Sequence, residues 1–277
     1  MKIAYVQTNP RQGAREENFN RAEALIANVE ADAFVFPELF STGYFFESRE
    51  ELAKLAEPMD DSPTFLWMRK IAGEKNCVVC GGFPELDKEK NKIYNSASIA
   101  SFIGPPVVHY RKLHLFDQEK ELFDPGDLPP RAANVGLAVA GIMICFDWIF
   151  PETMRLLALN DAQVVFHPAN LILPYCQPAM ITRSLENRLF SVTANRIGSE
   201  EVAGKKLTFT GRSQIVAPDG TVLAQASADR EEVGVVEIDP NLASDKMVTE
   251  NNHILKDRRV DMYEALMFTD AERQGRL

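Results

Sequence analysis

Residues 137–167 read LAVAGIMICFDWIFPETMRLLALNDAQVVFH, and this stretch decides the fold class. Its first part, residues 137–145, is a short apolar run, which is typical of a buried strand. Pro151 then opens a helical segment over residues 151–159, because proline is favoured at the first helical position. A second apolar run follows at residues 162–167. The order of strand, helix and strand predicts an α/β fold.

The same alternation of apolar runs and helical segments continues on both sides of this stretch. Further helices are expected at residues 14–29, 62–75 and 177–190. Further strands are expected at residues 2–7, 33–37, 77–83, 95–102, 107–112, 191–197, 213–217, 221–226 and 233–238. Hairpin-like pairs are expected within residues 77–112 and 213–238. Mixed sheets covered by helices predict one layered α/β domain over residues 1–277.

The composition indicates a globular protein that acts on small molecules. Of 277 residues, 45% are hydrophobic and 25% are charged, which excludes a disordered or collagen-like chain. The formal net charge is −10 and Lys and Arg do not cluster, so no nucleic-acid partner is expected. No apolar run approaches the ~20 residues that span a bilayer, and no secretory signal pattern is present. We therefore predict a cytoplasmic protein with reduced thiols and no membrane partner.

Cys145 is the first candidate for chemistry. It ends an expected strand and precedes a helix, the position where open α/β sheets place their ligands. Such a cysteine could be a nucleophile activated by a neighbouring base, and His167, at the end of the next strand, is a candidate for that base. A free cysteine is also often a buried apolar residue, and a histidine at a strand end is often only hydrogen-bonded. Position alone leaves these alternatives open.

Two charged residues also end predicted strands. Glu38 closes an apolar run, where burial of its carboxylate would suit general acid–base work. The alternative is a carboxylate that only binds the backbone of the turn that follows. Lys112 ends another strand beside Arg111, and this pair could equally be solvated. If Glu38, Lys112 and Cys145 converge on one rim, they can form a catalytic site.

Cys77 and Cys80 form a C-x2-C pattern that does not indicate a metal site. Residues three apart in a strand point to opposite faces, and no second cysteine pair is present to complete a tetrahedron. We interpret both as core residues. The sequence also lacks H-E-x-x-H, P-loop and dinucleotide-binding patterns, so no metal and no nucleotide cofactor is expected.

Three segments together resemble the catalytic blocks of the nitrilase superfamily, the carbon–nitrogen hydrolases. In the family's order they are Phe36-Pro37-Glu38-Leu39, Tyr110-Arg111-Lys112-Leu113-His114 and Gly141-Ile142-Met143-Ile144-Cys145-Phe146-Asp147. A helical segment, Arg183-Ser184-Leu185-Glu186-Asn187-Arg188, is similar to a further family block. The resemblance covers nearly the whole chain, and its motifs are most similar to those of small aliphatic nitrilase and amidase types.

The resemblance implies a four-layer α-β-β-α sandwich and a cysteine-dependent hydrolase. It implies Glu38 as general base, Lys112 as stabiliser of developing negative charge and Cys145 as nucleophile. The expected reaction is hydrolysis of a non-peptide carbon–nitrogen bond in a small amide or aliphatic nitrile, which gives a carboxylic acid and ammonia through a thioester acyl-enzyme. The resemblance implies no metal or organic cofactor.

Family members also carry a second glutamate in the loop after the lysine, and both Glu119 and Glu121 could fill this place. Some relatives place it seven residues before the glycine of a Pro-Gly pair, here Gly126, and others five residues before it. The seven-residue spacing fits better here. It favours Glu119 as the residue that orients substrate and holds Lys112.

The substrate is expected to be small and neutral or aliphatic. Family members that hydrolyse N-carbamoyl amino acids carry basic residues shortly after the cysteine, whereas residues 146–150 contain none. The candidate substrate-binding residues are Tyr44, Phe146, Trp148, Asn170 and Tyr175. Any one of the aromatic side chains could instead pack in the core. An N-carbamoyl compound hydrolase, an acyltransferase and a catalytically silent binding protein on the same scaffold stay open as alternatives.

The resemblance also implies self-association. Relatives commonly form dimers or larger assemblies, and residues 254–277 read as a C-terminal arm, of which residues 254–268 could cover a partner. We therefore expect a homodimer or a higher homo-oligomer.

Overall fold

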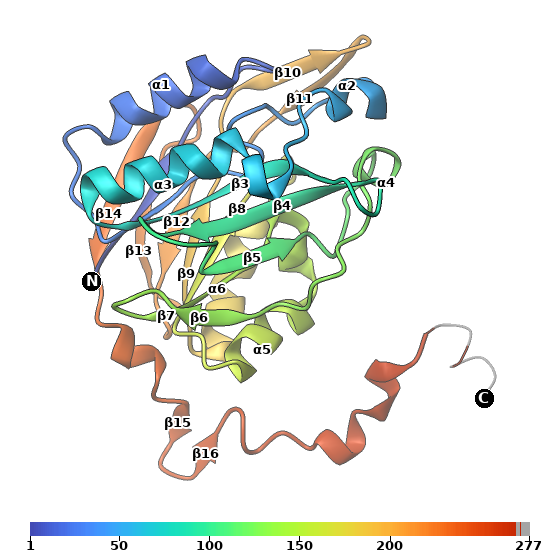
Figure 1. The fold of residues 1–277 in the computed structure, drawn as a ribbon. Helices are drawn as coiled ribbons and strands as arrows, with labels where there is room; N and C mark the ends of the chain where they lie inside the picture. The colour runs from blue at the N-terminus through green and yellow to red at the C-terminus, as the bar shows by residue number, and fades with distance from the viewer. Residues whose placement is uncertain (270–271, 273–277) are drawn as a thin grey trace. The chain divides into compact units, whose positions relative to one another are not determined.

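The computed structural model describes residues 1–269 and 272. The chain divides into two units, Met1–Ser244 and Asp245–Leu277. The first unit contains both large sheets and every residue that the sequence nominates for the site (Figure 1).

The first sheet has six strands in the order β14-β1-β2-β3-β4-β5. These strands are β1 (Lys2–Gln7), β2 (Ala33–Val35), β3 (Val78–Asp87), β4 (Lys92–Ala100), β5 (Val108–Arg111) and β14 (Glu232–Glu237). β1, β2 and β3 run parallel to one another. β4 and β5 follow in antiparallel hairpins, and β14 pairs antiparallel with β1. The parallel strands are buried along most of their length, as expected for strands that are covered on both faces.

The second sheet also has six strands, in the order β13-β12-β9-β8-β7-β6. These strands are β6 (Ala132–Asn134), β7 (Val139–Ile142), β8 (Val164–Pro168), β9 (Phe190–Ala194), β12 (Gln214–Val216) and β13 (Val222–Gln225). β7, β8 and β9 run parallel, and the outer strands pair antiparallel. The strand-helix-strand stretch that decides the fold is therefore β7, α5 and β8, with α5 spanning Pro151–Leu159.

Helices cover one face of each sheet (Figure 1). α1 (Arg15–Ile26) and α3 (Pro63–Lys75) pack on the first sheet, and α5 and α6 (Cys176–Asn187) lie over the second. The core under α1 and α3 includes Phe19, Ile26, Phe34, Phe65, Met68 and Val79. The other faces of the two sheets meet where β1, β2 and β3 contact β8 and β9. The result is the four-layer α-β-β-α sandwich that the sequence resemblance implies.

The expected helices form with small shifts at their ends. α3 begins at Pro63, and the Ser62 Oγ caps it by accepting a hydrogen bond from the Phe65 N–H at 3.0 Å. α3 has 13 residues.

Within residues 1–269 and 272, no helix combines the length and the apolar character that a membrane span requires.

Some sequence-based expectations were wrong. β12 and β13 form the expected hairpin, but β14 lies in the other sheet beside β1, because its apolar pattern fits either sheet and only the fold decides between them. The strand expected at residues 137–145 ends at Ile142. Short, largely polar elements were missed: α2 (Arg49–Ala53), α4 (Glu119–Leu122), β10 (Ser199–Val202) and β11 (Lys205–Thr208).

The C-x2-C pair belongs to the core region, as expected. Cys80, in β3, is fully buried. Cys77, directly before β3, is half-buried and packs against the core under α1 and α3. Both cysteines are free thiols.

In the described part of the second unit, Asp245–Leu277, the elements are short. They are β15 (Met247–Thr249), β16 (Asn252–His253) and 3-10 helices at Val260–Met262 and Glu264–Met267. The expected C-terminal arm, residues 254–277, falls in this unit. Its residues 270–271 and 273–277 lie outside the described residues.

Candidate active site

Cys145 lies just beyond β7, in the turn that leads toward α5. A 3-10 helix over Cys145–Ile149 separates the two elements. The Cys145 backbone has a φ of 41°, in the left-handed region that glycine adopts freely and other residues rarely do. Its side chain is buried, and the Asn170 N–H donates a hydrogen bond to it. A cysteine held in a strained turn fits a positioned reactive group better than a residue that only fills the core.

Lys112 lies between two carboxylates in the protein interior. Its side chain is 0% exposed, and its Nζ donates to Glu38 Oε1 and to Glu119 Oε1, each at 2.7 Å. Glu38 follows β2 and Lys112 follows β5, so these strand ends converge. A buried ammonium requires such partners, because an isolated charge is costly to remove from water.

Glu38 has one hydrogen-bonded oxygen and one open oxygen. Oε1 accepts from Lys112 and from Asn95 Nδ2, the latter at 2.6 Å. Oε2 is buried and has no hydrogen-bond partner within the described part of the chain. Gly82 of β3 makes room for this residue, because a Cβ there would lie 2.8 Å from Glu38 Cα. The Glu38 carboxylate interacts electrostatically with the Cys145 thiol, and an oxygen without a hydrogen-bond partner can accept a proton.

Glu119, in the first turn of α4, is fixed through both oxygens. Oε1 accepts from Lys112 and from the Tyr44 hydroxyl, the latter at 2.8 Å. Oε2 accepts from the Phe116 N–H at 2.9 Å. Glu121 is exposed, because two positions along a helix turn the side chain to another side. The structure therefore brings Glu119, and not Glu121, to Lys112.

The charges of the site favour a neutral thiol beside a charged lysine. Burial and the Glu38 carboxylate raise the pKa of the Cys145 thiol well above its ordinary value, and the opposing effect of Lys112 does not cancel this. Burial alone would lower the pKa of Lys112, but the carboxylates of Glu119 and Glu38 raise it above its ordinary value. Burial raises the pKa of Glu119 to about 6, although Lys112 opposes the rise. The thiol thus needs a base before it can react.

His167 does not contact the Cys145 thiol in a hydrogen bond. Its Nε2 donates to the Cys145 carbonyl at 2.9 Å, and its Nδ1 lies 3.0 Å from the Thr193 hydroxyl. Burial lowers the pKa of His167 to about 4, so the ring is neutral at pH 7. His167 therefore holds the Cys145 backbone in place. Of the two roles considered for it, base and hydrogen-bonded structural residue, the geometry favours the second.

A small hollow opens beside Cys145. Its volume is about 20 Å³, enough for roughly one water molecule, and Phe146, Trp148 and Asn170 line it. Tyr44 is buried, with its hydroxyl on Glu119. Tyr175, at the N-cap of α6, is 61% exposed and does not line the hollow. The structure thus gathers three of the five predicted substrate-binding residues beside the thiol.

Sequence reasoning missed several residues of this site. Asn95 and Phe116 donate hydrogen bonds to the Glu38 and Glu119 carboxylates. Further walls of the hollow are Leu171, Ile172 and Leu173. Of the missed residues, only these three could have been found from the sequence, because they directly follow Asn170, which was already a candidate. Asn95 lies inside β4, where nothing in the sequence distinguishes it from its neighbours.

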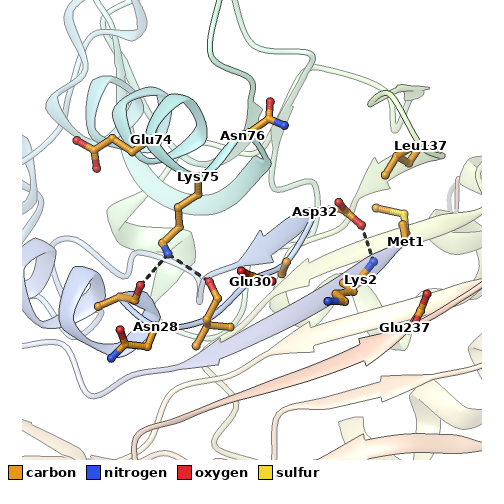
Figure 2. Close-up of a pocket in the computed structure, with 13 residues that line it drawn as sticks. Met1, Lys2, Asn28, Glu30, Asp32, Glu74, Lys75, Asn76, Leu137 and Glu237 are labelled. Carbon is orange, nitrogen blue, oxygen red and sulfur yellow. Dashed lines mark hydrogen bonds between the residues drawn. The ribbon is translucent and has the colours of Figure 1, made fainter.

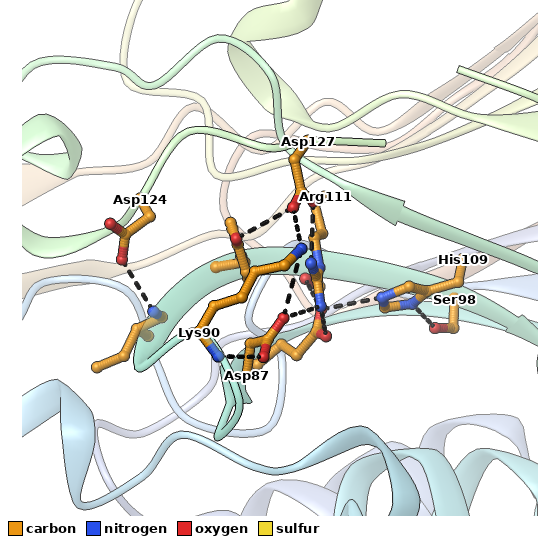
Figure 3. Close-up of polar contacts among 11 residues, drawn as sticks. Asp87, Lys90, Ser98, His109, Arg111, Asp124 and Asp127 are labelled. Carbon is orange, nitrogen blue, oxygen red and sulfur yellow. Dashed lines mark hydrogen bonds and ion pairs between the residues drawn. The ribbon is translucent and has the colours of Figure 1, made fainter. Parts of the chain in front are cut away.

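Arg111 pairs on the opposite face of β5 from Lys112, as strand alternation predicts. It pairs with Glu85 at 2.5 Å, with Asp127 at 2.9 Å and with Asp87 at 3.2 Å (Figure 3). The two neighbouring cations therefore belong to separate clusters. Arg111 is bound by carboxylates and is not part of a solvated pair.

A larger pocket, of about 930 Å³, lies away from the thiol, at the start of β1 and the ends of α1 and α3 (Figure 2). Lys75 Nζ donates there to the carbonyls of Ala27 and Val29 at 3.1 and 3.2 Å. None of the four candidate catalytic residues lines this pocket, so its size does not make it the active site.

Among the described residues, no three His, Cys, Asp or Glu side chains gather so that they could hold a metal ion.

Known proteins share this sequence pattern and this fold. The family model for carbon-nitrogen hydrolase matches residues 2–246. A nitrilase from Pyrococcus abyssi is 43% identical over 268 residues, which cover 95% of this chain and 99% of that protein. An N-carbamoylputrescine amidase from Arabidopsis thaliana is 30% identical, with 91% of each chain covered. The solved carbon-nitrogen hydrolase from Helicobacter pylori G27 has the same fold, with a TM-score of 0.85 at 24% identity over 97% of this chain and 98% of that one. The chain belongs to the carbon–nitrogen hydrolase family, and it is accordingly an enzyme that hydrolyses carbon–nitrogen bonds.

Proposed function

We propose that the protein hydrolyses a small, uncharged amide or aliphatic nitrile to a carboxylic acid and ammonia, with Cys145 as nucleophile. Glu38 acts as general base, Lys112 stabilises negative charge, and Glu119 holds Lys112 and orients the substrate. One observation carries this proposal: the buried Lys112 ammonium joins Glu38 and Glu119, at 2.7 Å from each, beside a buried thiol. This arrangement offers a base, an electrophilic cation and a nucleophile in one dry site.

The first half of the reaction forms the acyl-enzyme. Glu38 Oε2, which has no other partner within the described residues, takes the thiol proton as the Cys145 sulfur attacks the carbonyl or nitrile carbon. Negative charge develops on the substrate oxygen or nitrogen, where Lys112 Nζ and the Phe146 N–H stabilise it. For an amide, Glu38 then gives the proton to the leaving nitrogen. The carbon–nitrogen bond breaks, ammonia leaves, and a thioester remains.

The second half releases the acid. Glu38 takes a proton from water as the water oxygen attacks the thioester carbon. The carbon–sulfur bond breaks, and the proton returns to the Cys145 sulfur. A nitrile needs one additional water, which adds to the thioimidate formed first, and ammonia leaves from the resulting tetrahedral species to give the same thioester. Both substrates therefore use the same residues.

The residues that line the hollow beside Cys145 favour an uncharged substrate. Its walls are Phe116, Phe146, Trp148, Asn170, Leu171, Ile172 and Leu173. None of these side chains is charged, so a carboxylate or an ammonium group would be buried there without a partner, at considerable cost. The Arabidopsis relative is named N-carbamoylputrescine amidase, which makes an N-carbamoyl compound the second candidate substrate.

Ammonia release over a panel of aliphatic amides, aliphatic nitriles and N-carbamoyl compounds tests the proposal. We expect turnover of a small amide or nitrile by the parent and none by Cys145→Ala, with matching circular dichroism spectra. Release of carbon dioxide along with ammonia would identify an N-carbamoyl substrate. Binding without turnover by the parent would indicate a silent binding protein, and acyl transfer to an added amine without release of acid would indicate an acyltransferase. Equal turnover by both proteins would exclude Cys145 as nucleophile.

We also propose that the protein forms a homodimer in the cytoplasm. Exposed apolar side chains in the second unit support self-association: Val260, Met262, Leu266 and Met267 are 63%, 68%, 68% and 82% exposed. The free thiols support the location. Light scattering should give twice the chain mass of 31.0 kDa, and a monomer mass would contradict the dimer.

A further inference from the structure

We propose that Asp147 is a positioning residue that fixes Cys145 relative to Lys112, by tying the turn that holds the nucleophile to the segment that holds the lysine. This proposal rests on the proposed roles of Cys145 and Lys112. Asp147 follows the nucleophile by two residues and is 0% exposed. The mechanism above uses its carboxylate in no chemical step, so the burial of this charge requires another explanation.

Asp147 accepts four hydrogen bonds, two on each carboxylate oxygen. Oδ2 accepts from the Tyr110 hydroxyl at 2.9 Å and from the Ile144 N–H at 2.9 Å. Oδ1 accepts from His114 Nδ1 at 2.7 Å and from the His114 N–H at 3.3 Å. Each oxygen faces one backbone N–H, that of Ile144 on Oδ2 and that of His114 on Oδ1, and a backbone N–H cannot accept, so each oxygen position requires an acceptor.

These partners flank the two reactive residues. Tyr110 and His114 lie two residues before and two residues after Lys112, and Ile144 directly precedes Cys145. One carboxylate therefore joins the lysine segment to the nucleophile turn. None of its four bonds involves the Lys112 ammonium or the Cys145 thiol, so Asp147 acts through the backbone and side chains around them.

The nucleophile turn needs support because Cys145 has a positive φ of 41°. A residue other than glycine stays in this conformation only where its surroundings hold it there. The bond from the Ile144 N–H to Asp147 holds the turn before the cysteine, and the bond from His167 Nε2 to the Cys145 carbonyl holds it at the cysteine. Of these two supports, Asp147 is the one that is also bonded to both sides of Lys112.

We call the four hydrogen bonds that Asp147 accepts the clamp. Asp147→Asn disrupts the clamp without leaving a cavity. The amide has nearly the same volume, but in either orientation its NH2 group would face a backbone N–H donor, that of Ile144 or that of His114. The lysine segment and the nucleophile turn would then separate. A misplacement of about 1 Å between reacting groups can cost about 10²-fold in rate.

Steady-state kinetics on one good substrate give the first test. Asp147→Asn should lower kcat about 10²-fold and change KM by less than about threefold, because substrate binding does not depend on the clamp. Tyr110→Phe removes one of the four bonds and should lower kcat by less than about tenfold. Asp127→Asn is the matched control: Asp127 accepts a hydrogen bond from Arg111 at 2.9 Å, in the separate cluster, and kcat should stay within about twofold.

Alkylation of Cys145 by iodoacetamide gives a second test that needs no substrate. The titratable groups that interact with this residue are Glu38, Lys112, Glu119, Tyr44 and His167. Loss of the Asp147 charge would by itself favour the thiolate and speed alkylation. Loss of the clamp has the opposite effect, because the Lys112 ammonium moves away from the sulfur. We therefore expect Asp147→Asn to slow alkylation severalfold at about pH 8.

Slower alkylation together with a lower kcat in folded Asp147→Asn would support the proposal. Unchanged or faster alkylation would overturn it, and so would an equal loss of kcat in Asp127→Asn. If the parent turns over no substrate in the panel, the proposed function fails, while alkylation still decides the role of Asp147. If Asp147→Asn does not fold, Tyr110→Phe must slow both alkylation and turnover, and parental rates in that variant would overturn the proposal.

Discussion

Arg111 and Lys112 are neighbours in the chain, but they lie in two different ion-pair clusters. Arg111 makes two hydrogen bonds to Glu85 and one to Asp127 (Figure 3). Its guanidinium lies 4.0 Å from the centre of the Tyr94 ring. Lys112 contacts two buried carboxylates at 2.7 Å each, beside a thiol. The Lys112 cluster is buried, whereas the Arg111 cluster reaches the surface at Asp127, which is 34% exposed and also pairs with Lys90.

The two clusters differ in how well their carboxylates are stabilised. In the Arg111 cluster, burial alone would raise the pKa of Glu85, but hydrogen bonds from His109 and Arg111 lower it to about 2. In the Lys112 cluster, burial raises the pKa of Glu119 to about 6, and Glu38 keeps one oxygen without a partner within the described residues. A buried ion pair is therefore not by itself a sign of catalysis. A strained thiol next to an incompletely bonded carboxylate is a more specific sign.

The largest expected effect that separates the clusters is that of Lys112→Ala. A preorganised cation in a dry site stabilises developing charge strongly, and loss of one such donor costs on the order of 10²–10³ in rate. Steady-state turnover should fall at least that far. Lys112→Arg should not restore it, because a planar guanidinium does not replace a compact ammonium between two carboxylates. Near-parental turnover by Lys112→Ala would show that the wrong base has been assigned.

The next effect concerns the two glutamates of the α4 turn. Glu119→Gln removes one of the two charges that hold Lys112, and we expect turnover to fall about 10- to 100-fold. Glu121→Gln changes an exposed side chain and should stay within about twofold. Steady-state rates of the two variants on one substrate make the comparison. The reverse order would assign Glu121 as the second glutamate.

The proposed reacting groups could be predicted from the sequence, but their surroundings could not. Glu38, Lys112 and Cys145 could be predicted because each comes at or just beyond a strand end, where an α/β sheet gathers its functional residues. The hydrogen bonds that adjust this site come from distant segments: Asn95 lies 57 positions from Glu38, and Tyr44 lies 75 positions from Glu119. No local pattern encodes such pairs. For the same reason the hairpin-like pairing expected within residues 213–238 does not extend to β14, which pairs with β1.

A smaller effect is expected on the pH dependence of the Lys112 cluster. Glu119, with a pKa of about 6, takes up a proton as the pH falls through that value, and Lys112 then loses one of its two charged partners. The rate kcat/KM should therefore fall below about pH 6. Tyr44→Phe removes a donor that stabilises the Glu119 carboxylate, so it should raise the pKa of Glu119 and move this fall to higher pH. Identical pH profiles for parent and Tyr44→Phe would contradict the assignment.

The smallest expected effect on turnover is that of Arg111→Ala, whose main effect should be on stability. This change leaves Glu85, 2% exposed, without its bidentate partner, and such a loss costs about 3 kcal/mol in the free energy of unfolding. Urea unfolding measures that loss. Turnover per folded molecule should stay within about threefold, because the cluster lies on the other face of β5 from the thiol site.

The pH dependence of the unfolding free energy tests whether Arg111 stabilises the charged form of Glu85. The pKa of Glu85 is lowered from 4.5 to about 2 in the folded protein, so its contribution to stability is fully present above about pH 4.5 and is lost as the pH falls toward 2. In Arg111→Ala the folded pKa moves back toward 4.5, and the unfolding free energy should decrease less steeply over this range than in the parent. Asp124→Asn, which breaks a more exposed pair with Arg49, controls for general weakening and should leave the steep decrease largely in place. If Arg111→Ala instead lost turnover as severely as Lys112→Ala while folded, the two clusters would share one function, and the distinction between a structural and a catalytic cation in this strand would fail.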